Sequence, residues 1–268
     1  MLLADVWRDM RSKKDKGKKH SRACDMAEAS AAAMRGDYKT AHKIWVAHTG
    51  DARAQAEIGR CFLYSYGVER DSDLAQRWLT LAAKSGDPLG QRLLGDFYLE
   101  GAAGQPEPLI AEEWYARAAQ QGDAEAQDQL SALLAESGHR KPDYRQAHEW
   151  ALKAAEQGIA SAMTRLGILY NSALGVARNA RLAVEWWLKA AAAGDADGQA
   201  LLGAAYQLGA GVAKDRVAAL MWLTRARVGQ SALADRYYWG VLENCSPEER
   251  AEAERRASLP LGNEEGRP

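Results

Sequence analysis

The chain repeats a pattern of apolar and polar positions with a period of 36 residues. Early in each period an apolar residue is followed four positions later by an aromatic residue or a leucine, a spacing that puts both on one face of a helix. The pattern therefore predicts a helix in the first half of each period. The two positions are held by Ile58, Leu94, Leu130, Leu166 and Leu202, and by Phe62, Tyr98, Leu134, Tyr170 and Tyr206.

A second helix is predicted in the later half of each period. It is marked by an alanine and, three positions later, a tryptophan, which share one face. An aspartate or asparagine before this helix suits its N-cap, and a glycine after it suits a left-handed C-cap. The markers are Ala75, Ala111, Ala147, Ala183 and Ala219; Trp78, Trp114, Trp150, Trp186 and Trp222; Asp71, Glu107, Asp143, Asn179 and Asp215; and Gly86, Gly122, Gly158 and Gly194.

The helix pairs define a repeat array with flanking segments. Because each pair contacts only its neighbours, the array predicts an all-α fold, a right-handed α/α superhelical solenoid of helix-turn-helix repeats. Near the C-terminus, Ser246 and Glu249 form a capping box with Pro247 at the first helical position, which predicts a terminal helix. We expect a basic, disordered leader over 1–23, five repeats over 52–231 (52–87, 88–123, 124–159, 160–195 and 196–231), C-terminal capping helices over 232–258 and a disordered tail over 259–268.

Small and large residues are expected to have different structural roles in each unit. A glycine in the first helix lowers helix propensity by about 1 kcal/mol relative to alanine, so the close approach of a neighbouring helix is its expected purpose. The tryptophans are interpreted as buried rings between successive helix pairs, and Trp150→Ala would then cost about 3–5 kcal/mol. The small residues are Gly59, Gly95, Gly167 and Gly203, with Ser131 at the remaining position.

One unit carries the whole repeat pattern. Its residues are Leu202-Gly203-x-x-Tyr206-x-x-Gly209-x-Gly211-Val212-x-x-Asp215-x-x-x-Ala219-x-x-Trp222. This pattern resembles that of the Sel-1-like repeat (SLR) family, which is related to tetratricopeptide repeats. Unit 160–195 matches nearly as well. Unit 124–159 departs at Ser131 and Leu134, and unit 88–123 departs in its loop, which reads Gly104-Gln105-Pro106.

The resemblance extends beyond the five units. The sequence Gly36-Asp37-Tyr38-x-x-Ala41 is similar to the tetratricopeptide-like opening pair of these proteins, so 24–51 is interpreted as a degenerate first repeat. The segment around Ser246 is similar to their terminal helix. The resemblance thus covers about residues 24–258, and it is specific for the fold and weak for the function.

The family implies that this chain is an adaptor or scaffold for a partner protein or peptide. A solenoid offers a long concave surface for such a partner. The candidate contacts vary between units and lie on the first helix, away from its packed face. An exposed apolar row favours a binding groove, and its members would be Leu93, Ile168, Leu201 and Leu208. The alternative is that these positions form a solvated helix face. The candidates are Glu57, Arg60, Tyr64, Leu93, Asp96, Glu100, Gln129, Arg165, Ile168 and Leu201.

Two other functions stay open, namely a dedicated neutralising binder of the immunity type, directed at one toxin or enzyme, and an enzyme. The enzyme is disfavoured because GxSxG, P-loop, dinucleotide and HExxH motifs are all missing. His42 and His48 are six residues apart and do not share a helical face, while His139 and His148 straddle a loop and a helix start. We therefore expect no catalytic residue, metal site, cofactor or small-molecule substrate.

Charge is concentrated in the leader. Residues 1–22 carry eight Lys or Arg against three Asp, a balance of +5, so the total of −1 leaves −6 for the remainder. The basic stretch at 11–22 is a candidate for contact with nucleic acid or an anionic membrane, although a solvated tail is the plainer interpretation.

Three cysteines bear on the cellular compartment. Cys24, Cys61 and Cys245 are odd in number and widely spaced, which predicts neither a disulfide framework nor a zinc site, and Cys61 falls on an apolar helix position. The chain lacks an apolar run of about 18 residues, so no transmembrane helix is predicted. We expect a bacterial, cytoplasmic protein. A start of translation nearer Met26 is a further interpretation of the basic leader. A different true start that hides a signal peptide would change the expected compartment to the periplasm or to secretion.

Overall fold

The computed structural model describes residues 22–102, 104–136, 138 and 140–261. These residues form fourteen α-helices and no strand, which confirms the predicted all-α solenoid of helix pairs. The chain divides into two compact units, Met1–Asp123 and Ala124–Pro268. Residues 1–21, most of the predicted leader, and residues 262–268 lie outside the described part, as does His139.

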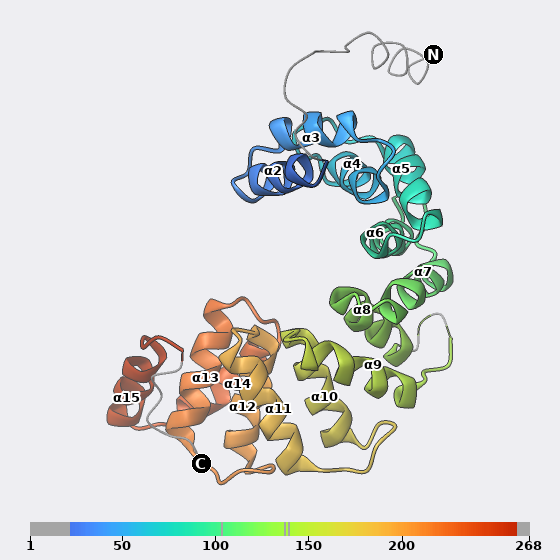
Figure 1. The fold of residues 1–268 in the computed structure, drawn as a ribbon. Coiled ribbons are helices and arrows are strands. Elements are labelled where there is room, and N and C mark those ends of the chain that lie inside the picture. Colours follow the sequence, from blue (N-terminus) through green and yellow to red (C-terminus); the bar gives the residue numbers. More distant parts are fainter. Residues whose placement is uncertain (1–21, 103, 137, 139, 262–268) are drawn as a thin grey trace. The chain divides into compact units, whose positions relative to one another are not determined.

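The first unit contains three helix pairs (Figure 1). The predicted opening repeat forms one pair, and the first two Sel-1-like units form the others. In each pair the two helices pack on each other, and α5 packs in turn on α6. The pairs are α2 (Arg22–Met34) with α3 (Tyr38–Ala47), α4 (Ala52–Tyr64) with α5 (Ser72–Lys84), and α6 (Pro88–Leu99) with α7 (Pro108–Gln120).

The second unit contains three further pairs and two terminal helices (Figure 1). Both terminal helices pack on α13, and α14 also contacts α12. The pairs are α8 (Ala124–Ala135) with α9 (Tyr144–Glu156), α10 (Ala160–Ser172) with α11 (Ala180–Ala192), and α12 (Ala196–Leu208) with α13 (Arg216–Val228); the terminal helices are α14 (Ala234–Glu243) and α15 (Pro247–Ala257).

The predicted helix ends are confirmed by their hydrogen bonds. Before the second helix of four repeats, the Asp or Asn side chain accepts from the backbone N–H three residues on, whereas Glu107 makes no such bond. Ser246 and Glu249 form the predicted capping box at the start of α15. The repeat-closing glycines have φ angles of +87° to +92°, in the left-handed region that favours glycine: Gly86, Gly122, Gly158 and Gly194.

The glycines within the first helices face the residue that follows each repeat tryptophan. A Cβ atom added to Gly59 would lie 2.7 Å from the Leu79 side chain, and one added to Gly95 would lie 2.7 Å from Tyr115. Gly167 and Gly203 face Trp187 and Leu223 in the same way. The glycine therefore makes room for a large buried side chain.

In the third repeat both of these positions change together. Ser131 replaces the glycine, and the residue opposite is the small Ala151. Both side chains are fully buried, and the Ser131 hydroxyl donates to the Ala147 carbonyl oxygen at 2.7 Å. The departure of this unit from the repeat pattern is thus compensated within the same contact.

The prediction that the repeat tryptophans are buried is wrong for four of the five. Only Trp222 is buried, at 3 % exposed, while Trp78, Trp114, Trp150 and Trp186 are half-buried. The residue directly after each of these tryptophans, such as Leu79 or Tyr115, occupies the buried position of the helix. One face of each tryptophan ring therefore remains accessible. In most repeats a basic side chain three residues later covers that face: Arg117, Lys153, Lys189 and Arg225 lie 3.9–5.2 Å from the ring centroids.

Within each unit the first helices of neighbouring repeats contact one another, as α4 does with α6, and α10 with α8 and α12. The second helices instead pack on the first helix of the next repeat, as α5 does on α6 and α11 on α12. The first helices therefore line the inner side of each unit. We use the name inner face for the surface of α4 and α6 in the first unit and of α8, α10 and α12 in the second.

Candidate binding surface

The inner face of the first unit is built around ion pairs. Glu57 on α4 is only 7 % exposed, and its carboxylate lies 2.7 Å from the Arg60 guanidinium and 3.8 Å from that of Arg53. Burial raises the pKa of Glu57, against the opposing effect of the two arginines. Removing one partner from such a pair leaves an uncompensated buried charge, so Glu57 and Arg60 first of all stabilise α4.

A second polar cluster lies on α6. The Tyr115 hydroxyl donates to Asp96 at 2.7 Å, and Arg92 pairs with Asp96 at 3.6 Å and with Asp123 at 3.2 Å. Burial raises the pKa of Asp96. Burial and the adjacent Asp96 carboxylate also raise the pKa of Tyr115, so its hydroxyl stays a donor. The cluster joins α6 to α7 and leaves Asp96 half-buried.

Tyr64 and Glu100 connect neighbouring first helices. The Tyr64 hydroxyl donates to Glu100 at 3.4 Å, which links α4 to the end of α6. Glu100 is exposed and Tyr64 is half-buried. The prediction that Leu93 is exposed in this row is wrong. Leu93 is 2 % exposed and packs in the core with Phe97. It lies buried because it belongs to an apolar cluster to which α4, α5 and α6 all contribute.

The inner face of the second unit is more apolar. Ile168 on α10 is 38 % exposed and Leu208 on α12 is 62 % exposed. Leu201 is half-buried against the core of this unit, so the expectation that it is fully exposed is wrong. Gln129 on α8 is exposed, as a contact residue must be.

Arg165 holds α10 to α8. Its guanidinium pairs with Asp128, which also accepts from the Ser161 hydroxyl at 2.6 Å. The Arg165 side chain is 20 % exposed, so part of it remains accessible to solvent. The structure thus brings the candidate residues of each unit onto its first helices, and it divides them into accessible residues and residues that pair or pack.

A row of glutamines was missed in the sequence although it keeps the 36-residue step. It consists of Gln55, Gln91, Gln127 and Gln199 near the start of four first helices, all nine-tenths or more buried. The Gln91 and Gln199 amides each donate at 3.3 Å to a carbonyl at the end of the preceding second helix. Their spacing was the available signal, but a polar residue at a buried position is invisible to an apolar periodicity.

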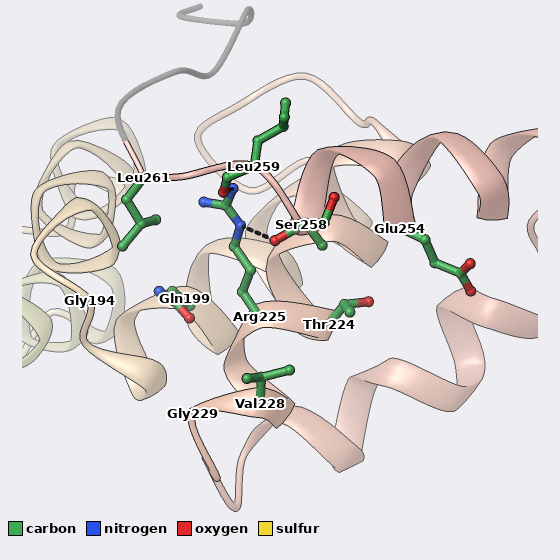
Figure 2. Close-up of a pocket in the computed structure, with 11 residues that line it drawn as sticks. Gly194, Gln199, Thr224, Arg225, Val228, Gly229, Glu254, Ser258, Leu259 and Leu261 are labelled. Carbon is green, nitrogen blue, oxygen red and sulfur yellow. Dashed lines mark hydrogen bonds between the residues drawn. The ribbon is translucent and has the colours of Figure 1, made fainter.

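A pocket of about 450 Å³ in the second unit was also missed (Figure 2). Arg225 extends from α13 across it toward the backbone that follows α15. It is 8 % exposed and donates to the carbonyl oxygens of Arg256, Ala257 and Leu259 at 2.8–3.3 Å. The guanidinium therefore satisfies the free carbonyls at the end of α15, a role that its place in the repeat does not reveal.

The described residues hold no group of three or more metal-ligating side chains. Cys61 and Cys245 are free and buried, and for Cys61 this agrees with the predicted core position. Burial raises the pKa of the Cys61 thiol to about 12, so it is protonated at neutral pH. In the part of the chain that the structure covers, none of the helices combines the length and the apolarity needed to cross a membrane.

The stacked helix pairs define a repeat protein of the α-solenoid class. The Sel1 repeat family model matches residues 52–87, 88–123, 124–159, 160–195 and 196–227, and the chain belongs to this family. This confirms the resemblance found in the sequence. No curated protein matches the chain.

Solved structures show the same fold. A Sel1 repeat protein from Oxalobacter formigenes is 25 % identical and superposes with a TM-score of 0.76 over 91 % of this chain and 99 % of that chain. A protective antigen present in uropathogenic Escherichia coli strains, which displays an SLR fold, is 23 % identical with a TM-score of 0.56, over 88 % of this chain and 60 % of that one. Sel1 repeat proteins are generally binding scaffolds without catalytic activity.

Proposed function

We propose that this chain is an adaptor or scaffold that holds a partner protein or peptide on its inner face. The observation that carries the proposal is the pair of exposed apolar side chains on neighbouring first helices, Ile168 and Leu208. Residues that define the repeat, such as Ala183 and Ala219, are fully buried in the same unit. The scaffold is thus constant while the accessible positions differ from repeat to repeat, as a binding surface requires.

The physical gain from a partner comes mainly from these apolar groups. Burying a fully exposed leucine or isoleucine side chain contributes about 1.5–3 kcal/mol, and Ile168 and Leu208, 38 % and 62 % exposed, gain the corresponding share of it. Arg165 lies one turn from Ile168 on α10, and its side chain is 20 % exposed, so it is the nearest cation for an acceptor on the partner. Together these residues favour a partner surface that combines an apolar patch with a carboxylate or carbonyl oxygen.

The proposal is tested by changing the exposed apolar positions without touching the core. The partner is first captured on the full chain from a native lysate, identified by mass spectrometry, purified and titrated by calorimetry. We expect one-to-one binding that Ile168→Glu and Leu208→Glu each weaken by about tenfold or more, because a carboxylate replaces a buried apolar contact.

Leu109→Glu is the matched control. The exposed fraction of Leu109, 57 %, is similar to the 62 % of Leu208. Leu109 lies on the second helix α7, however, and not on the inner face. It should leave the affinity unchanged. Equal loss in all three variants, or no loss in the two inner-face variants, would contradict the proposal.

A further inference from the structure

The first Sel1 repeat, residues 52–87, has an open groove on its second helix, α5. It has a volume of about 770 Å³ and is lined by α5 and by the turn and first residues of α4. Its apolar wall consists of Leu74, Trp78 and Leu81, and Leu81 is 50 % exposed. This surface is separate from the inner face, and its occupancy does not depend on the function proposed above.

The pocket of Figure 2 is the same site four repeats later. Gln55, Thr80, Leu81, Lys84 and Ser85 line the groove, and the residues 144 positions on line the pocket. Those residues are Gln199, Thr224, Arg225, Val228 and Gly229. The repeat thus creates a concavity at one defined position, between the start of its first helix and the end of its second.

In the fifth repeat the chain itself covers this concavity with a segment that is not helical. Ser258, Leu259 and Leu261 line the pocket from the side opposite α13, and Arg225 binds the Leu259 carbonyl at 2.8 Å (Figure 2). In this repeat the concavity therefore takes a short non-helical segment, which Arg225 holds by a backbone carbonyl oxygen.

In the second and third repeats long side chains close the same position. Gln121 donates to Gln91 at 2.8 Å and Gln157 donates to Gln127 at 2.8 Å, while Arg117 and Lys153 cover the tryptophan rings. These side chains come from the end of the second helix and fill the concavity beside the start of the first helix of the same repeat.

The first repeat lacks both closing residues. Ser85 stands where Gln121 and Gln157 stand, and Leu81 replaces the basic residue. Accordingly, the buried Oε1 of Gln55 has no hydrogen-bond donor, and within the described residues no cation covers Trp78. The groove therefore offers an unused acceptor beside an uncovered aromatic ring.

The charge at the rim has one sign. Arg77 and Lys84 are the charged residues among those that line the groove, and both are exposed. Neither pairs with a carboxylate in the described part of the chain. An incoming segment with acidic residues beside its apolar anchor would meet both cations at the edge of an apolar floor.

We propose that this groove is a second docking site, which takes a short non-helical segment of a partner protein with an apolar anchor residue flanked by Asp or Glu. The anchor packs on Trp78 and Leu81, a backbone N–H of the segment donates to Gln55, and the acidic residues face Arg77 and Lys84. The occupant thereby takes the place that residues 258–261 take in the fifth repeat.

The test uses the full chain and a phage library of random 12-residue peptides, with Leu81→Arg as the matched variant. Leu81→Arg restores the residue that Arg117 and Arg225 provide in other repeats, so the variant is expected to fold. We expect the enriched peptides to carry an aromatic residue or leucine between acidic residues. A synthetic copy should bind Leu81→Arg about tenfold more weakly or worse.

Two further variants sharpen the result. Arg77→Glu with Lys84→Glu should weaken the same peptide, whereas Ile168→Glu on the inner face should not, which separates this site from the proposed function.

Several outcomes would overturn the proposal. Basic enriched peptides, or equal binding to Leu81→Arg, would exclude the apolar and acidic segment. Self-association of the wild-type chain in light scattering that Leu81→Arg abolishes would assign the groove to a second copy. Displacement of the selected peptide by a synthetic peptide of residues 1–21 would assign it to the chain's own leader.

Discussion

At the residue scale, the core depends on matching a small side chain on one helix with a large one on the next. The backbone of α10 approaches α11 so closely that a Cβ on Gly167 would overlap the Trp187 indole. The indole N–H donates to the Thr164 carbonyl at 3.2 Å, which fixes the ring against the helix backbone. Glycine therefore persists here despite its cost of about 1 kcal/mol in helix propensity.

We expect Gly167→Ser to destabilise the chain by about 1–3 kcal/mol, because the added atoms displace a packed ring. The double variant Gly167→Ser with Trp187→Ala copies the natural Ser131 and Ala151 pair. Its loss should be smaller than the sum of the two single losses by about 1 kcal/mol or more. Denaturant unfolding of the four proteins measures this coupling, and additive losses would show that the two positions are independent.

The tryptophans themselves should differ in their contribution to stability. Trp222→Ala removes a buried ring and should cost about 3–5 kcal/mol. Trp150→Ala removes a half-buried ring covered by Lys153 and should cost less, about 1–2 kcal/mol. Thermal melting of the two variants provides the comparison. Equal shifts in Tm would mean that exposure in the structure does not govern their contribution.

At the element scale, one position of the second helix serves two purposes. In the second to fourth repeats its basic residue covers the tryptophan of the same helix. In the fifth repeat Arg225 also binds the carbonyls at the end of α15, a helix whose single buried residue is Ala253. Because α15 buries so little of its own surface, its attachment depends on α13.

Arg225→Leu should release α15 while the repeats remain folded. Three hydrogen bonds from the guanidinium to carbonyl oxygens are lost. We therefore expect the free energy of opening α15 to fall by about 1.5–3 kcal/mol. Amide hydrogen exchange of residues 247–257 provides the measurement. Lys189→Leu, which changes the equivalent residue two helices earlier and only uncovers Trp186, should leave that exchange unchanged. Unaltered exchange in Arg225→Leu would show that apolar packing alone holds α15.

At the scale of the whole molecule, each unit has a histidine that burial keeps neutral. Burial lowers the pKa of His42, whose ring packs edge-on to Phe62, and lowers that of His148, which hydrogen-bonds the Tyr170 hydroxyl at 2.9 Å. The unfolded chain then binds more protons than the folded chain as the pH falls below about 6.5. Their contribution to stability is therefore complete above that pH and is lost on acidification.

We expect the free energy of unfolding to fall between pH 7.5 and pH 5, and His42→Phe to reduce that fall. Phenylalanine keeps the edge-on ring contact and removes both the titrating group and the buried Nδ1, which has no hydrogen-bond partner. Urea unfolding at several pH values measures the slope for each protein. The same dependence in wild type and variant would place the pH sensitivity elsewhere.

The sequence by itself determined the helix pairs, their ends and the family. These features depend on local chemistry repeated at 36-residue intervals: an Asp or Asn before the second helix, a glycine after it, and apolar residues on one face. Since each repeat contacts only its neighbours, the pattern of one unit was enough to predict the stacking of the rest.

Only the tertiary structure decided which side chains are accessible. Leu93 is buried although exposure was predicted, and Trp150 is only half-buried although burial was predicted. The exposure of each residue depends on the side chains that lie beside it, such as Lys153 on the same helix over Trp150, or Ser85 at the end of α5 beside Gln55 on α4. The 36-residue period contains what the repeats have in common, whereas the exposure of a side chain depends on neighbouring residues that differ from repeat to repeat.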